Sequence, residues 1–249
     1  NKMVWADMDF FPDCDLRTTL LDYARLFFYG AEPEAIADGI LSLELNWQCD
    51  PAENPTIDRT LDTFEMLNSK YPFLAKNWRF VQLHMRAKCD WVLRHRRLFE
   101  LNLIKLAEKE IANGNLENAK EILNADFDET YKKERTDITA MCQKLFELIG
   151  LQTDIENYCA DNWERGAILE TIDLPVTDRK WLLGKLENAE SVDYMNKIIK
   201  RNKVRGDEYY FSVALNGLDE CGVSQNGEIY MNFQGDRPNV NTGEMPVCM

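Results

Sequence analysis

Apolar residues recur at helical spacing along most of the chain. Leu16, Leu20 and Tyr23 open the first such run, which follows Asp15, an N-cap candidate, and stops at Gly30. The next two runs begin at Pro33 and after Pro55, since proline suits the first turn of a helix, and they stop before Pro51 and Pro72. The pattern predicts helices over about residues 16–30, 33–47, 56–70, 75–113, 116–125, 129–149, 153–160, 163–171, 178–189 and 191–204.

The longest of these helices, over residues 75–113, contains neither proline nor glycine. Its apolar positions fall at steps of three, four and seven, so we expect it to be the spine of the fold. The connections between the predicted helices are short, which favours antiparallel neighbours. The expected fold class is therefore mainly α, an irregular antiparallel helical bundle.

The residue composition of the sequence changes near its end. Residues 209–215 and 228–233 are rich in aromatic and β-branched side chains, and the glycine-rich segment 216–227 separates them. They predict a short C-terminal β-hairpin or the start of a β domain. We accordingly expect a helical domain over residues 11–205 and a β-rich tail over residues 206–249.

The composition excludes several classes of partner. The net charge is −14, from 43 acidic and 29 basic residues, and this charge repels nucleic acids and anionic lipids. The apolar runs are far shorter than the roughly 20 residues that a membrane span requires. Neither end carries a signal peptide or a charged tail, and we expect the chain to be a piece of a longer polypeptide.

Metal and cofactor chemistry have little support. The histidines His84 and His95 lie on one predicted helix, where eleven residues separate them by roughly 16 Å, too far to share an ion. The seven cysteines are widely spaced without a C-x-x-C pair, which indicates buried or free thiols. Nucleotide-binding and nucleophile motifs are absent from the sequence, so we expect no cofactor and no metal.

An acidic cluster near the N-terminus is the best candidate for chemistry. It consists of Asp7, Asp9, Asp13 and Asp15, beside Trp5 and Phe10. Paired carboxyls hydrolyse glycosidic bonds, and aromatic faces stack on sugar rings. Asp13 and Asp15 are also explained as helix caps. Trp5 and Asp7 remain as the substrate-binding candidates, in the context of a preceding domain.

Two charged segments favour structural roles. The basic run at residues 94–97 stands alone in an acidic protein, so we expect it to pair with neighbouring acids rather than to bind an anion. In the segment 162–182, Arg165 or Arg179 paired with a carboxylate would fix the angle between two helices. The candidate carboxylates are Glu164, Asp173 and Asp178.

Several segments resemble the C-terminal region of large bacterial proteins that are similar to glycoside hydrolases. They are residues 2–9, 21–28, 39–47, 77–80, 165–175 and 179–182. In that family a hexosaminidase-like domain and a TIM barrel precede a helical region, which a β-sandwich sometimes follows. The resemblance implies that residues 1–10 are the last barrel strand or its exit, that the helices pack on the barrel, and that carbohydrate is the substrate.

The chain lacks the strands of a barrel, so an acid/base pair at the strand ends cannot be assembled from it. We therefore expect a non-catalytic helical accessory domain that packs on the TIM barrel of a carbohydrate-active enzyme. One alternative is a helical protein-interaction scaffold, because residues 114–123 look like half of a tetratricopeptide unit, although no 34-residue recurrence accompanies them. Another is an independent hydrolase with a carboxylate pair.

Overall fold

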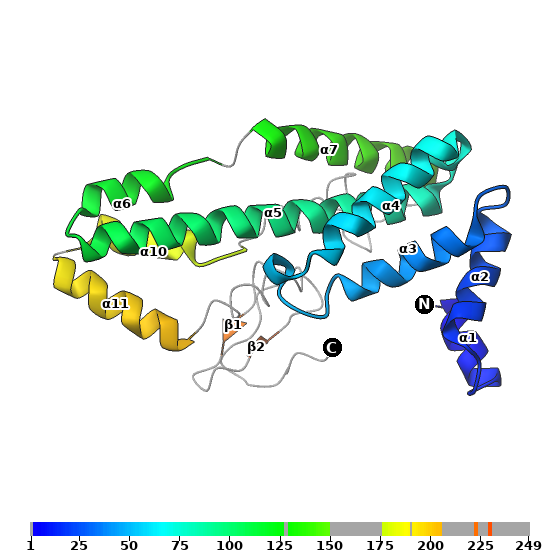
Figure 1. Ribbon diagram of the computed structural model, residues 1–249, viewed down its shortest axis with the longest axis horizontal. Coiled ribbons are helices and arrows are strands. Elements are labelled where there is room, and N and C mark those ends of the chain that lie inside the picture. Colours follow the sequence, from blue (N-terminus) through cyan, green and yellow to red (C-terminus); the bar gives the residue numbers. More distant parts are fainter. Residues whose placement is uncertain are drawn as a thin grey trace. The chain divides into compact units, whose positions relative to one another are not determined.

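A computed structural model describes residues 2–126, 129–149, 176–189, 191–205, 222–223 and 229–230. The described part of the chain is mainly helical, as the sequence predicts (Figure 1). The helices expected over residues 153–160 and 163–171 and the strand expected over residues 209–215 lie outside the described residues.

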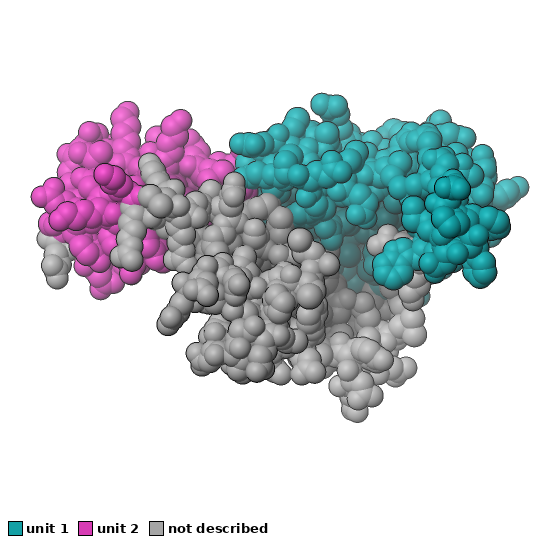
Figure 2. All heavy atoms as spheres, turned by 90° about the horizontal axis from the view of Figure 1, so that it is seen from below, with its two compact units in different colours: residues 1–95, 128–172 teal, residues 96–127, 173–249 magenta. Residues whose placement is uncertain are grey.

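The chain divides into two compact units (Figure 2). Unit 1 comprises residues 1–95 and 128–172, and unit 2 comprises residues 96–127 and 173–249. The expected helical domain over residues 11–205 contributes to both units. The expected boundaries near residues 10 and 205 stay a prediction.

The long helix α5 is continuous from Trp78 to Ala112, and its two halves belong to different units. The other helices of unit 1 are α1 (Lys2–Phe10), α2 (Leu16–Phe27), α3 (Pro33–Leu45), α4 (Thr56–Lys70) and α7 (Glu129–Ile149), with the short 3-10 helices η1 (Pro51–Glu53) and η2 (Pro72–Lys76). Unit 2 also contains α6 (Leu116–Leu123), α10 (Arg179–Glu187) and α11 (Val192–Arg205).

Local signals explain most of these boundaries. The Asp15 side chain caps α2 by accepting hydrogen bonds from the backbone N–H groups of Arg17 at 3.4 Å and Thr18 at 3.1 Å. The predicted ends of the helices over residues 56–70 and 129–149 coincide with those of α4 and α7. Helix α5 begins later than expected because residues 72–76 form η2.

The N-terminal segment differs from one expectation. The resemblance implied that residues 1–10 are a barrel strand or the exit from one, whereas Lys2–Phe10 forms the helix α1. The strand alternative is therefore wrong for these residues. Helix α1 packs against α2, and this local contact favours a helix that belongs with the helical region.

Three hydrophobic clusters form the cores of the units. In unit 1, α2 packs on α3 and α3 on α4, and the first half of α5 closes this cluster around the buried Phe64. A second cluster joins α5 to α7 through Met85, Val92 and Ile138. In unit 2, α5, α6, α10 and α11 share a core that includes Ile111 and Leu182.

The described part of the tail contains a minimal antiparallel pair, β1 (Gly222–Val223) and β2 (Ile229–Tyr230). Strand β2 lies within the predicted strand 228–233, but β1 lies in the segment expected to be the glycine-rich connection. These residues do not support the predicted hairpin between 209–215 and 228–233. Separately, none of the described helices combines the length and apolar character that crossing a membrane requires.

Candidate functional site

The two residues proposed to face a sugar project to different sides of α1. Two residues along a helix correspond to a rotation of about 200°, so Trp5 and Asp7 cannot share a face. The Asp7 carboxylate accepts a hydrogen bond from the Thr19 hydroxyl at 2.6 Å, which fastens α1 to α2. The Trp5 side chain is instead 73% exposed. The structure does not bring these two residues together into one site.

Trp5 belongs to a larger set of exposed apolar side chains, which we call the α1 apolar surface. It consists of Trp5, Met8, Phe10 and Phe11, with exposed fractions of 73%, 44%, 80% and 70%. Trp5 and Met8 lie on one side of α1, whereas Phe10 lies about 140° around the helix axis from Trp5, so the set spans more than one face of the helix. Single exposed apolar residues are ordinary, but four large ones within one short segment are characteristic of a surface that another molecule covers.

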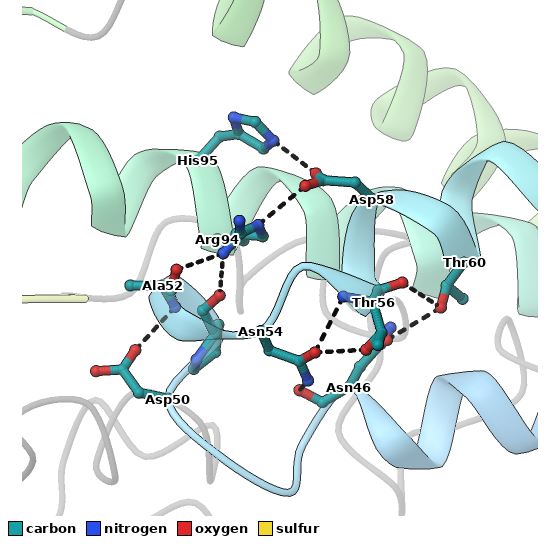
Figure 3. Close-up of polar contacts among 10 residues, drawn as sticks. Asn46, Asp50, Ala52, Asn54, Thr56, Asp58, Thr60, Arg94 and His95 are labelled. Atoms are coloured by element: carbon teal, nitrogen blue, oxygen red, sulfur yellow. Dashed lines mark hydrogen bonds and ion pairs between the residues drawn. The ribbon is translucent and has the colours of Figure 1, made fainter.

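A group of polar contacts fastens the connection between α3 and α4 onto α5 (Figure 3). The Arg94 guanidinium donates to the carbonyl oxygens of Pro51 at 2.6 Å and Ala52 at 2.5 Å, and its Nε lies 3.2 Å from Asp58 Oδ2. The other oxygen of Asp58 lies 2.8 Å from His95 Nε2, and the His95 ring stacks on Trp91. The expected pairing of the basic run with neighbouring acids is confirmed for Arg94 and His95.

The same connection contains an asparagine that organises its backbone. Asn54 donates through its side-chain amide to the carbonyl oxygens of Leu45 at 3.0 Å and Asn46 at 3.2 Å. Its side-chain oxygen accepts a hydrogen bond from the backbone N–H of Thr56 at the start of α4. Figure 3 shows Asn54 beside Asn46 and Thr56, in the connection that contains η1. The contacts satisfy buried backbone groups, which is a structural task.

A fully buried carboxylate lies on the neighbouring turn of α5. Asp90 is 1% exposed and accepts hydrogen bonds from the Asn46 amide and from Arg86 Nε, both at 2.9 Å. Burial raises the pKa of Asp90 to about 6, against the opposing influence of Arg86 and Asn46.

A second charged cluster joins α4, α5 and α7. The Lys88 ammonium lies 2.9 Å from Glu65 Oε1 and 3.0 Å from Glu134 Oε2, and His84 Nε2 lies 3.1 Å from the same oxygen of Glu65. Burial alone would lower the pKa of Lys88, but its hydrogen bonds to the two carboxylates raise that pKa overall. Burial lowers the pKa of His84, which favours the neutral ring. The cluster binds three helices together and leaves Lys88 charged.

In unit 2 the segment from residue 176 is held by arginines. Arg97 donates to the carbonyl oxygen of Val176 at 2.6 Å. Arg179 donates to the carbonyl oxygens of Leu123 at 2.6 Å and Ala125 at 2.7 Å, beyond the end of α6. These contacts support the structural role expected for Arg179, with carbonyl oxygens as the acceptors in these hydrogen bonds. Arg165, Glu164 and Asp173 lie outside the described residues.

Among the described residues, no group of three His, Cys, Asp or Glu side chains is placed to hold a metal ion. Cys89 and Cys142 are buried in the cluster between α5 and α7, and burial raises the pKa of the Cys89 thiol. A thiol with a raised pKa is a poor nucleophile. The polar clusters of the described residues are thus explained by contacts between helices, and the α1 apolar surface is the candidate functional feature.

Sequence reasoning missed both buried charge clusters. Only the four-residue spacing of Arg86 and Asp90 on a predicted helix could have indicated one of them. The partners Asn46, Glu65 and Glu134 come from other helices, and their approach depends on the tertiary fold.

Comparisons of the chain with protein-family models, with curated proteins and with solved structures found no match. The resemblance to glycoside-hydrolase-like proteins, and the roles of Trp5 and Asp7 that it suggests, therefore stay predictions.

Proposed function

We propose that this chain is a non-catalytic helical accessory domain of a glycoside-hydrolase-like, carbohydrate-active enzyme, and that it packs on the TIM barrel of that enzyme. In this proposal the helices form an irregular antiparallel bundle that supports the barrel. Trp5, at the junction, closes one side of the substrate cleft.

The α1 apolar surface is the observation that carries the proposal. An exposed Trp and two exposed Phe side chains within one segment would be costly to leave in water, since fully burying such a side chain contributes about 1.5–3 kcal/mol. Because aromatic side chains are enriched in the cores of interfaces, their concentration here favours a docking role over chance exposure.

The anchoring of α1 supports the same reading. The hydrogen bond from Thr19 to Asp7 joins α1 to α2, and Thr19 itself is only 4% exposed. A docking element held in a fixed orientation loses less conformational entropy on binding than a free tail does. In this proposal Asp7 positions α1 through its hydrogen bond with Thr19, and Trp5 contacts the barrel.

The alternative function is a helical protein-interaction scaffold. The packing of α2, α3 and α4 in chain order favours it, because scaffold repeats stack each helix on its predecessor. The two functions differ in the partner. The accessory domain needs one barrel domain of its own polypeptide, whereas the scaffold binds separate proteins.

The proposal is tested by producing this chain and the barrel as separate polypeptides and measuring their association by calorimetry. We expect binding that is lost in a Trp5→Ser, Phe10→Ser double variant. Leu106→Ser is the matched control, because Leu106 is 43% exposed on α5 within unit 2. Glycosidase activity should reside in the joined polypeptide and not in this chain alone. Lack of association, or equal loss in the control, would refute the docking role.

A further inference from the structure

Unit 1 carries a second group of exposed apolar side chains, which we call the η2 surface. It consists of Leu26, Tyr29, Phe73 and Trp78, with exposed fractions of 66%, 89%, 45% and 37%. These residues come from the end of α2 and the turn that follows it, from η2 and from the start of α5, which meet at one end of the unit (Figure 1). This surface is distinct from α1, which contacts α2 nearer its N-terminus through Thr19.

Contacts between these elements hold the segments that carry the η2 surface together. A Cβ atom placed on Gly30 would lie 3.5 Å from the Phe73 ring, so Phe73 of η2 lies close to the backbone that follows Tyr29. The Asn77 side chain donates to the carbonyl oxygen of Phe27 at 2.6 Å, which fastens the start of α5 to the end of α2. The aromatic residues are therefore presented by a fixed framework.

An arginine lies within this framework. The Arg79 guanidinium lies 4.0 Å from the centre of the Phe27 ring and 4.2 Å from that of Trp78. Two aromatic faces hold the guanidinium in place by cation–π attraction. Its orientation is thus fixed before any partner arrives, which reduces the entropy lost on binding.

Two basic side chains, Arg79 and Lys76, belong to the segments that carry this surface. The Arg79 guanidinium contacts Trp78, and Lys76 is an exposed residue of η2, in a protein whose net charge is −14. Lys70 lies 5.2 Å from the centre of the Tyr71 ring and 2.9 Å from a carboxylate oxygen of Glu32. Because Glu32 pairs with Lys70, the basic rim of the η2 surface consists of Arg79 and Lys76. Such a rim attracts a partner of complementary charge.

We propose that the η2 surface binds an acidic segment of another protein that carries aromatic or large aliphatic side chains. Exposed Tyr, Trp and Arg are the residue types that dominate binding energy in protein interfaces. The basic rim selects carboxylates, and the aromatic residues supply the apolar contact. A second copy of this chain is disfavoured as the occupant because both copies carry −14. The η2 surface is separate from the α1 apolar surface, so this proposal can be tested independently of the proposed function.

The test measures binding of a short fluorescein-labelled peptide of Glu, Trp and Leu to the purified chain by fluorescence anisotropy. We expect saturable binding that weakens with added salt. Tyr29→Ser and Lys76→Glu should each weaken it at least about tenfold, the size typical of a residue that anchors an interface. Both side chains are exposed, so the variants should fold. Lys105→Glu, an equal change of charge at an exposed position in unit 2, should leave the affinity unchanged.

Three results would overturn this proposal. The first is equal binding of a peptide in which Lys replaces every Glu, or no binding of the acidic peptide. The second is tighter binding of oligogalacturonate, an anionic sugar chain, at the same residues. The third is a dimer in sedimentation experiments that Tyr29→Ser dissociates, which would make a second copy the occupant.

Discussion

Asn46 donates a hydrogen bond to the carboxylate of Asp90 at 2.9 Å, although 44 positions separate the two residues. The side-chain oxygen of Asn46 in turn accepts a hydrogen bond from the Thr60 hydroxyl at 3.1 Å. Through this pair the end of α3, the first turns of α4 and the middle of α5 are joined inside unit 1. A buried carboxylate at such a junction makes the stability of the fold depend on pH.

Asp90 should make the protein less stable as the pH rises from about 4 to 7. The folded-state pKa is about 6, above the model-compound value of 3.8, so the folded protein binds a proton more tightly than the unfolded chain. This contribution is fully present below the unfolded pKa and is lost as the pH rises through 6. A shift of about two pKa units corresponds to roughly 3 kcal/mol. Urea unfolding at a series of pH values measures it.

The variant Asp90→Asn should remove this part of the pH dependence. The variant must be compared with the unchanged protein because His84 also makes stability depend on pH. Burial lowers the pKa of His84, so its contribution to stability is lost as the pH falls, which is opposite to the effect of Asp90. Asp62→Asn, at an exposed position of α4, is the matched control and should keep the pH profile of the unchanged protein. Identical profiles for Asp90→Asn and the unchanged protein would contradict the assignment.

Lys88→Met should lower the free energy of unfolding by about 3 kcal/mol. The substitution leaves the Glu134 carboxylate without the Lys88 ammonium, and breaking a buried ion pair typically costs that much. Adding Glu134→Leu should recover part of the loss, because it removes the buried carboxylate that Lys88→Met leaves without its cation. Double-mutant analysis by urea unfolding measures this coupling.

The control for that experiment is Lys120→Met. Lys120 forms a pair with Glu117 on the surface of α6, where the Glu117 side chain is 86% exposed. Exposed pairs contribute about 0–1 kcal/mol, so this variant should stay close to the unchanged protein. Equal effects at Lys88 and Lys120 would show that the buried cluster has no special importance.

Local signals made much of the fold predictable. Both ends of helix α4 were predicted correctly because Pro55 precedes it and Tyr71-Pro72 follows it. The start and stop signals therefore agree with the spacing of the apolar residues. Helix α1 was not predicted, since its nine residues have weak amphipathic character and the family resemblance implied the last barrel strand or its exit. Its helical state is supported by packing on α2, and such tertiary support is not visible in a local pattern.

The candidate site was less predictable than the fold. Trp5 was singled out because an aromatic residue stands beside several acids, and its exposure is consistent with a contact role. The position of Asp7 against Thr19 could not be foreseen, because a carboxylate in an acidic chain has many potential donors. The role of Arg79 could not be foreseen either. Its guanidinium contacts the rings of Phe27 and Trp78, which come from two different helices, and their approach depends on the tertiary fold.

Two glycines of unit 2 should respond to alanine with opposite signs. Gly114 has φ +88°, a left-handed conformation that costs an alanine roughly 1–2 kcal/mol, so Gly114→Ala should destabilise the unit. Gly184 lies inside α10 with no atom within 4 Å of an added Cβ, and Gly184→Ala should stabilise it by up to about 1 kcal/mol. Thermal unfolding of both variants decides this, and shifts of equal sign would contradict the assigned conformations.

The central claim is that the α1 apolar surface is covered by a barrel domain of the same polypeptide. Hydroxyl-radical footprinting tests this claim most directly. It compares the oxidation rate of Trp5 in this chain alone with the rate in the polypeptide that includes the barrel. Tyr29, which is 89% exposed on the η2 surface, serves as the internal reference. We expect the barrel to protect Trp5 strongly while Tyr29 reacts equally in both. Unchanged oxidation of Trp5 would contradict the docking of α1 and the function built on it.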